Sequence, residues 1–411
     1  MLPNATNTSG HITQESTSDF QARMSQLRNE AQGVRRTWPV RQRHWLRWLT
    51  TAHVVVVASL WYVIWDVSEQ WWLGSVLTFL PRTPWLVPGL LLILIGLLRH
   101  SRTIWANLAI TLFVMFSIVG FNVPWQSLVA VSDKATTTDD RSIQTVRVVS
   151  ANTQHFEPDF SLLLREIRSA KPDVIALQEA SRPPKSLSDQ FPDWQSVRIR
   201  GLWVGSKWPL KLIGQCDSDV YERVTAIMVE VDAPFGKFLV SDLHLMTARK
   251  SLIYLHPKSV LAGTGQETVT EALIERSEEA RQTREFITEH SRDLPLIICG
   301  DFNMPTSSSI YRTCFGDFAN SFEQASWGCG YTAPCRAIRY WPTNVPWQRI
   351  DHILANHRWR IVASQVGQRD GSDHRLMAAT LRLNTDADAL ATPTGSPTDL
   401  SNEVEQLRAG R

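Results

Sequence analysis

The stretch Leu294-Pro295-Leu296-Ile297-Ile298-Cys299-Gly300-Asp301-Phe302-Asn303 joins an apolar run to a polar end. The run predicts a buried strand, with Asp301 and Asn303 following where it ends. Residues two apart on an extended chain point the same way, so we expect both side chains to face one cleft. A carboxylate there can orient a nucleophile or hold a metal ion, and an amide can donate to a phosphoryl oxygen. Gly-Asp-x-Asn also suits a tight turn, so the rest of the chain has to decide between the two interpretations.

Other predicted strands end in polar residues of the same kind. Carboxylates, amides and imidazoles lie at the ends of further predicted strands. The apolar runs are at 145–150, 173–177, 237–241 and 349–354, and one more polar segment precedes a last strand at 376–383. These residues are Asn152, Gln178, Glu179, Asp242, His244, Asp351, Asp373 and His374. A single residue of this kind is usually a surface residue. Such a set is what a metal-assisted hydrolase requires, and its recurrence favours that interpretation.

The motifs, in this order, resemble those of the endonuclease/exonuclease/phosphatase superfamily, which includes DNase I-like nucleases, neutral sphingomyelinases and inositol-polyphosphate 5-phosphatases. The resemblance covers about residues 144–383 and includes the segment Ser206-Lys207-Trp208-Pro209. It implies a four-layer α/β sandwich, in which two mixed β-sheets pack face to face with helices outside. The matching motifs are Ser150-Ala151-Asn152, Leu177-Gln178-Glu179, Asp242-Leu243-His244-Leu245, Gly300-Asp301-Phe302-Asn303, Arg349-Ile350-Asp351-His352-Ile353 and Ser372-Asp373-His374.

The local sequence pattern agrees with an α/β fold. Apolar residues at helical spacing predict an amphipathic helix at about 159–170, and Lys171-Pro172 ends it. A charged helix is expected at about 269–290, with Ile274, Ala280, Phe286 and Ile287 as its buried stripe. Short strands are predicted at 145–151, 194–200, 202–206, 223–231 and 237–243.

The resemblance implies a divalent metal site. Glu179 would be the principal ligand, Asn152 the second, and Asp373 would bind directly or through water. Carboxylate and amide oxygens suit Mg²⁺ or Mn²⁺. No set of Cys and His has the spacing of a zinc site.

The resemblance also assigns catalytic roles. His374 would act as general base or acid, oriented by Asp351. Asp301 would position or activate the attacking water, and Asn303 and His244 would contact phosphoryl oxygens. Whether Asp301 or His374 takes the proton stays open at this stage.

Two further residues are candidates for substrate binding. Arg249, on the long segment after His244, could touch a phosphate or a headgroup. Glu222 precedes a strand, and in DNase I-like members a glutamate in a similar segment pairs with the histidine matched by His244. A solvated surface glutamate is the competing interpretation.

The first third of the chain has a different character. Residues 1–44 are polar and predict a disordered cytoplasmic arm. Residues 45–131 predict a transmembrane region of about three helices, at 46–66, 83–99 and 104–125, and hold nine of the chain's 17 Trp. A buried helical domain is the alternative. Residues 384–411 predict a disordered tail.

Positive charge predicts the topology. Arginines before the first span and between the second and third would lie in the cytoplasm, which places the 144–383 domain outside it. If the short middle span does not cross, the domain would instead be cytoplasmic. Of the five cysteines, Cys299 is expected to be a buried thiol, whereas Cys216, Cys314, Cys329 and Cys335 are interpreted as loop residues that could form two disulfides, with Cys329 joined to Cys335 or Cys314.

The net charge of +2 and the absence of a basic run interleaved with aromatics argue against a duplex binder. The combined interpretation is a membrane-anchored, bacterial-type member of the superfamily that hydrolyses phosphoesters with Mg²⁺ or Mn²⁺, phosphodiesters before phosphomonoesters. Its partners would be the membrane and a lipid headgroup or nucleic acid, with no protein partner expected. A nuclease is the alternative enzyme, and a catalytically silent membrane scaffold is the alternative of another class.

Overall fold

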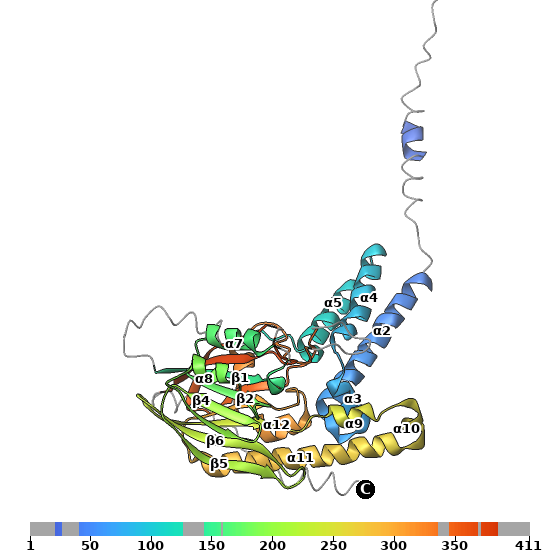
Figure 1. The fold of residues 1–411 in the computed structure, drawn as a ribbon. Helices are drawn as coiled ribbons and strands as arrows, with labels where there is room; N and C mark the ends of the chain where they lie inside the picture. Colours follow the sequence, from blue (N-terminus) through green and yellow to red (C-terminus); the bar gives the residue numbers. More distant parts are fainter. Residues whose placement is uncertain are drawn as a thin grey trace, which may run out of the picture.

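Two six-stranded β-sheets form the centre of the molecule, and helices cover their outer faces (Figure 1). The computed structural model describes residues 21–26, 41–125, 144–157, 159–335, 345–368 and 371–384. Both sheets are mixed, so the predicted four-layer α/β sandwich is confirmed. In the arm predicted as disordered at 1–44, residues 21–26 and 41–44 are described and are helical, and its other residues lie outside the described ones. The tail predicted at 384–411 lies outside them except for Asn384.

The first sheet has the order β11-β12-β1-β2-β4-β3. Strand β1 lies in its middle, parallel to β2 and antiparallel to β12. The strands are β1 (Thr145–Asn152), β2 (Val174–Gln178), β3 (Gln195–Ile199), β4 (Leu202–Ser206), β11 (Trp359–Val366) and β12 (Met377–Leu383).

The second sheet has the order β5-β6-β7-β8-β10-β9. Strands β7 and β8 are parallel, and β10 runs antiparallel to β8. The strands are β5 (Leu210–Ser218), β6 (Arg223–Ala233), β7 (Gly236–His244), β8 (Leu296–Asp301), β9 (Ala319–Asn320) and β10 (Asp351–Ala355).

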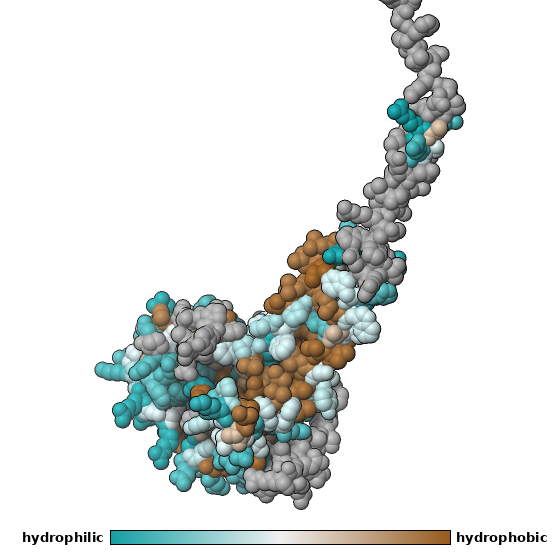
Figure 2. Space-filling view, turned by 90° about the vertical axis from the view of Figure 1, so that its right-hand side faces the viewer, coloured by the Kyte–Doolittle hydropathy of each residue, from teal (hydrophilic) through white to brown (hydrophobic). Residues whose placement is uncertain are grey.

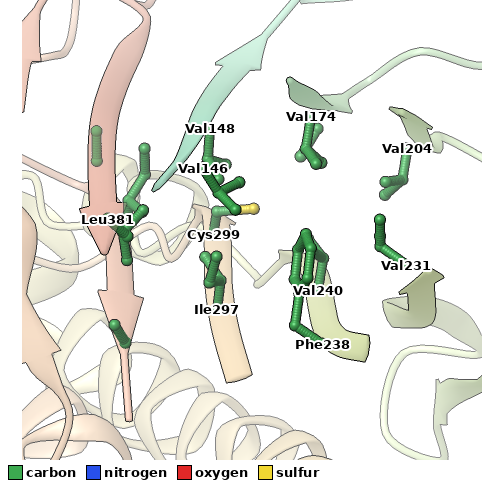
Figure 3. Close-up of a cluster of buried hydrophobic side chains, with 14 of the residues drawn as sticks. Val146, Val148, Val174, Val204, Val231, Phe238, Val240, Ile297, Cys299 and Leu381 are labelled. Atoms are coloured by element: carbon green, nitrogen blue, oxygen red, sulfur yellow. The ribbon is translucent and has the colours of Figure 1, made fainter. Parts of the chain in front are cut away.

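Alternating side chains hold the layers together. On β8, Ile297 and Cys299 point into the core between the sheets, whereas Leu296 and Ile298 pack under the outer helices. The core between the sheets consists largely of β-branched residues, which suit a pleated and buried surface (Figure 3). The apolar run quoted first is therefore apolar throughout because both of its faces are buried.

The outer helices are partly those expected. On the first sheet lie α7 (Phe160–Ser169) and α8 (Lys185–Gln190), and on the second α11 (Thr264–Ser291) and α12 (Ser309–Phe315). Helix α13 (Ser321–Ala325) packs against β11, β10 and β9 instead, with Phe322 in the core between the sheets. Helix α11 begins five residues before the predicted 269, after Gly263 at φ 83°. Of its predicted stripe, Ala280 and Ile287 are fully buried, while Ile274 and Phe286 are half-buried.

From residue 41 on, the described part of the N-terminal region contains four α-helices; three project from the sandwich, and the one at 72–79 lies against it (Figure 1). They are α2 (Arg41–Tyr62), α3 (Trp72–Phe79), α4 (Leu86–Leu98) and α5 (Thr103–Phe113). Within the described residues, only His44–Gln70 is by itself long and apolar enough to cross a membrane. Helices 72–79 and 83–98 meet at a 91° bend, and 103–118 is shorter. The third helix ends near Ile118, not at the predicted 125, because Gly120 adopts φ 79° and Asn122 pairs with Gly328 of the sandwich.

A buried ion pair joins the N-terminal region to the sandwich. Arg276 of α11 donates to Glu69, which lies just before α3, over 3.1 Å, and both side chains are 2% exposed. The same guanidinium donates to the carbonyls of Met246 and Asn303. Glu69 also accepts a hydrogen bond from Ser308. Ser68 and Arg82 also donate buried hydrogen bonds to Ser307, so several polar contacts that are closed off from water join the two parts of the chain.

The disulfide prediction is wrong. All five cysteines lie in the described residues, and none forms a disulfide. Cys216 is on β5 and Cys314 on α12, both packed in the core under the second sheet, whereas Cys329 contacts the N-terminal helices. Cys299 is a buried thiol on β8, as expected.

The Glu69–Arg276 pair yields a stability prediction. Glu69→Gln keeps the side chain's size but leaves a buried guanidinium without its countercharge, so we expect it to lower the free energy of unfolding by about 3 kcal/mol. The measurement is thermal unfolding of the full chain in detergent. The matched control is Glu271→Gln on the exposed face of α11, which should stay within about 0.5 kcal/mol. Equal stability of the two variants would contradict the prediction.

Candidate functional site

The predicted polar residues meet at one edge of the two sheets. Asn152 ends β1, His244 ends β7 and Asp301 ends β8, while Asp351 begins β10 directly opposite Asp301. Glu179 follows β2 in a left-handed conformation, at φ 55°. Because β1 and β2 are parallel, as are β7 and β8, their carboxyl ends come together where the sheets face each other.

Asn152 connects two carboxylates. Its amide nitrogen donates to Glu179 Oε1 over 3.2 Å and to Asp301 Oδ2 over 3.0 Å, and its amide oxygen accepts from the backbone N–H of Gln154. Asn152 is 2% exposed and Asp301 is 1% exposed. Two acidic groups from different sheets are thus held together by one buried amide.

His374 and Asp351 form a close pair. His374 Nδ1 lies 2.9 Å and 3.1 Å from the two oxygens of Asp351, and its Nε2 lies 3.8 Å from Asp301 Oδ2. Burial lowers the pKa of His374, but the carboxylates of Asp351 and Asp301 outweigh burial and raise it to about 10. Burial raises the pKa of Asp301 to about 7, and the charge of Asp351 adds to this while His374 opposes it. A protonated imidazole between two acids follows from this arrangement.

His244 is in the opposite electrostatic situation. Burial lowers its pKa to about 3, and the positive charges of Arg223 and His374 act in the same direction. Its Nε2 lies 3.7 Å from Asp301 Oδ2 and 3.9 Å from Glu179 Oε1. The site therefore contains one imidazole that favours the neutral form and one that favours the charged form.

Asn303 and Asp373 complete the predicted set. Asn303 adopts φ 52°, and its backbone N–H donates to Asp301 Oδ1 over 2.9 Å. Its side-chain amide donates one hydrogen bond to the carbonyl of Leu245. Asp373 Oδ1 lies 4.0 Å from His374 Nε2, and its backbone N–H donates to Gln154.

The two predicted substrate-binding residues lie in different places. Arg249 is exposed and lines a cleft of about 610 Å³ together with Asn303, Asp373 and His374. Glu222 is exposed, and its neighbour Arg223 is the residue that reaches His244, donating to its carbonyl over 2.5 Å. Arg223 also bonds to the buried Glu279. This contact differs from the one that the resemblance suggested for Glu222, because Arg223 binds the backbone carbonyl of His244 and not its imidazole.

Sequence reasoning missed two features of the site. His155, three residues after Asn152, has its Nε2 3.5 Å from Glu179 Oε2, and only its proximity to Asn152 in sequence could have indicated it. Gln178 donates across the sheets to Asp242 over 2.5 Å. Burial raises the pKa of Asp242 well above its usual value. This pair is completely buried, which indicates a structural role behind the site.

The donor chemistry fits a divalent metal ion. Glu179 and Asp301 offer carboxylate oxygens, which are ligands that Mg²⁺ and Mn²⁺ prefer. Asn152 turns its amide nitrogen toward both acids, so this amide would have to turn over to present its oxygen as a further ligand. Ligand atoms of Asp301, Asp351 and His374 also lie within 4.8 Å of one another. In that second group, however, His374 Nδ1 and Asp351 already bond to each other. Glu179, with its carboxylate 28% exposed, is the more accessible acid.

The fold and this cluster of acids, amides and imidazoles define the class of metal-assisted phosphoester hydrolases. The chain belongs to the Endonuclease/Exonuclease/phosphatase family, whose model matches residues 149–374, more than half of its length. It is an enzyme of the class to which that family belongs, the metal-dependent hydrolases of phosphoester bonds. No curated protein matches the chain.

Solved structures of similar fold come from several organisms. A family protein of Bacteroides thetaiotaomicron is 16% identical, with a TM-score of 0.44, covering 60% of this chain and 100% of its own. The human Nocturnin catalytic domain with bound sulfate is 16% identical, with a TM-score of 0.42 and coverage of 59% and 94%. A mannosyl-6-phosphatase of B. thetaiotaomicron is 16% identical, with a TM-score of 0.42 and coverage of 57% and 99%.

The Asp351–His374 pair gives a kinetic prediction. Asp351→Asn removes the carboxylate that fixes the imidazole's proton and orientation, so kcat should fall by about a thousandfold or more while KM changes little. The measurement is Mg²⁺-dependent hydrolysis of bis-p-nitrophenyl phosphate by the full chain in detergent. Asp189→Asn, on the exposed face of α8, is the matched control. A kcat equal to that of this control would show that Asp351 does not act through His374.

Proposed function

We propose that this chain is a membrane-anchored, divalent-metal-dependent phosphoesterase that cleaves P–O bonds by attack of water, with phosphodiesters as its preferred class of substrate. The observation that carries the proposal is the convergence of Asn152, Glu179, His244, Asp301 and His374, from both sheets, within hydrogen-bonding or ion-pair distance of one another. Nothing in the packing of the sandwich requires so many polar groups at one edge.

The pKa shifts of Asp301 and His374 favour different catalytic roles for these two residues. Asp301, with its pKa raised to about 7 by burial, takes the proton of the attacking water. His374, held in the charged form by Asp351, faces the negative charge that grows on the phosphoryl oxygens. Neutral His244 and the amide of Asn303 donate hydrogen bonds to the same oxygens. The water oxygen bonds to phosphorus, the ester P–O bond breaks, and the departing alkoxide takes up a proton from solvent.

Glu179 and Asn152 would hold the metal ion, with Asp373 beside them. When bound, a divalent ion supplies Lewis-acid stabilisation of a phosphoryl oxygen. The carboxylate of Asp301, tied to Glu179 through Asn152, keeps the water-activating group next to this site.

Membrane anchoring is supported by the surface of the N-terminal helices. Large apolar side chains are more than half exposed along α4, where Leu90, Leu91, Leu94, Leu97 and Leu98 are each between 52% and 73% exposed. Apolar surface concentrates on this helical region, whereas the sandwich is largely hydrophilic (Figure 2). A contiguous apolar surface of this kind needs lipid or a partner to cover it. A bilayer covers all of these helices at once.

Metal dependence can be tested with matched variants. With Mg²⁺ the full chain in detergent should hydrolyse bis-p-nitrophenyl phosphate, and chelation should abolish turnover. Glu179→Gln and His374→Gln should each lose about a hundredfold or more in kcat/KM. Glu289→Gln and His357→Gln, both exposed and remote from the site, should retain it. Metal-independent turnover, or full activity of Glu179→Gln, would contradict the proposed site.

The same protein preparation can distinguish a phospholipid esterase from a nuclease. Nicking of supercoiled plasmid at a rate above that for any phospholipid would make nucleic acid the substrate. A folded protein that turns over no phosphoester would point to the silent membrane scaffold.

The three-span topology gives a separate prediction. With helices α2, α4 and α5 all crossing, a reporter fused after Arg411 should be active as alkaline phosphatase and dark as green fluorescent protein, because the arginines near the first and third spans stay in the cytoplasm. The reverse pattern would mean that the short α4 of 13 residues does not cross.

A further inference from the structure

The cleft beside His374 is apolar on most of its walls. It has a volume of about 610 Å³, within the range typical of small-molecule sites. Its polar end consists of Asn303, Asp373 and His374, with Arg249 at its rim. The other walls are mostly apolar, with two polar residues among them, and are formed by Phe79, Ala248, Leu252, Ile253, Ala333, Pro334, Trp347 and Ile350 together with Thr247 and Gln348.

This composition selects against a purely polar substrate. A phosphosugar or a nucleic acid backbone would leave its hydroxyls or further charges facing aliphatic walls, because the cationic groups of the lining are His374 at the polar end and Arg249 at the rim. A phosphoester with a long hydrocarbon part would place its phosphate at the polar end of the cleft and its hydrocarbon chain against the apolar walls. The chemistry of the cleft therefore indicates an amphiphilic substrate.

The cleft is also built in part by the N-terminal region. Phe79 is the last residue of α3, and its carbonyl accepts a hydrogen bond from Trp347 Nε1 over 3.1 Å. Its ring lies 5.2 Å from the guanidinium of Arg276, which holds the carbonyl of Asn303. One wall of the cleft thus belongs to the same helices that carry the lipid-like surface.

The segment opposite Phe79 has the composition of an interfacial helix. Helices α9 (Arg249–Ile253) and α10 (Pro257–Ala262) both pack against α11, and α9 lines the cleft together with Phe79 of α3 (Figure 1). Ile253, Tyr254 and Leu261 are 69%, 60% and 92% exposed, and the exposed Lys258 adds a positive charge. Exposed apolar and aromatic side chains beside cations are typical of segments that lie in the headgroup layer.

We propose that this cleft binds the hydrocarbon part of a bilayer lipid phosphoester, which enters between α3 and α9 and places its phosphate against Asn303 and His374. This inference rests on the proposed phosphoesterase function and names the substrate class of that site. Arg249, at the rim, meets the headgroup, and Leu252 and Ile253 contact the chain.

The test uses the full chain in vesicles of phosphatidylglycerol and phosphatidylcholine that contain a few per cent of phosphatidylglycerol with a diazirine in its acyl chain. After illumination, cross-links should map to the peptides that hold Leu252, Ile253 and Trp347, besides those in α2, α4 and α5. The double variant Leu252→Gln/Ile253→Gln should reduce the cleft cross-links by about tenfold, since polar amides disfavour an alkyl chain without adding charge. Val362→Gln, an exposed apolar site on β11, is the matched control and should cross-link as the wild type does.

A kinetic arm separates this inference from the proposed function. The ratio of the rate on long-chain phosphatidylglycerol to the rate on bis-p-nitrophenyl phosphate should fall about tenfold in the double variant and stay constant in Val362→Gln. Cross-links confined to α2, α4 and α5, or an unchanged ratio, would overturn the cleft assignment even where the soluble diester is hydrolysed. Cleft cross-links without hydrolysis of either substrate would instead refute the phosphoesterase function and leave the lipid site standing.

Discussion

Two buried carboxylates, Asp301 and Asp351, lie opposite each other across the antiparallel strands β8 and β10, and the rest of the site compensates their repulsion. His374 binds Asp351 and approaches Asp301, while Asn152 donates to Asp301 from the other sheet. Each neighbour that supplies positive charge or a hydrogen bond is therefore fixed in position. The same repulsion keeps a proton within the cluster near neutral pH, which is the condition for acid–base chemistry on water.

Keeping these groups together requires backbone conformations that most residues avoid. Glu179 and Asn303 both have positive φ. Glu179 directly follows the buried strand β2, and Asn303 lies just after the end of the buried strand β8. Such conformations persist where the surroundings determine them, and here the hydrogen bonds from Asn152 to Glu179 and from Asn303 to Asp301 do so. The strand that precedes each turn is completely buried, so the sandwich acts as the rigid support for these turns.

The sandwich could be predicted through the family resemblance that the order of the polar motifs carries. The residues at its edge could be predicted also because Asn152, Glu179, His244 and Asp301 end or follow apolar runs that form buried strands. Strand β5 escaped prediction since it is largely exposed and shows no regular alternation. Helices α9 and α10 were missed because they are short and carry apolar residues outward. The Arg223–His244 contact depends on how β6 pairs with β7, and the Glu69–Arg276 pair joins residues 207 positions apart, so neither leaves a local pattern in the sequence.

Arg276 connects a glutamate before α3 to the backbone of Asn303, so one side chain belongs at once to the N-terminal helical region and to the turn beside the cluster of acids. The N-terminal helices are consequently not interchangeable with an unrelated segment. Such an exchange would leave this buried guanidinium without its carboxylate partner unless α11 changed at the same time. We therefore expect the two parts to be inherited as a single module, and we expect a displacement of α3 to reach the turn at Asn303 through Glu69 and Arg276.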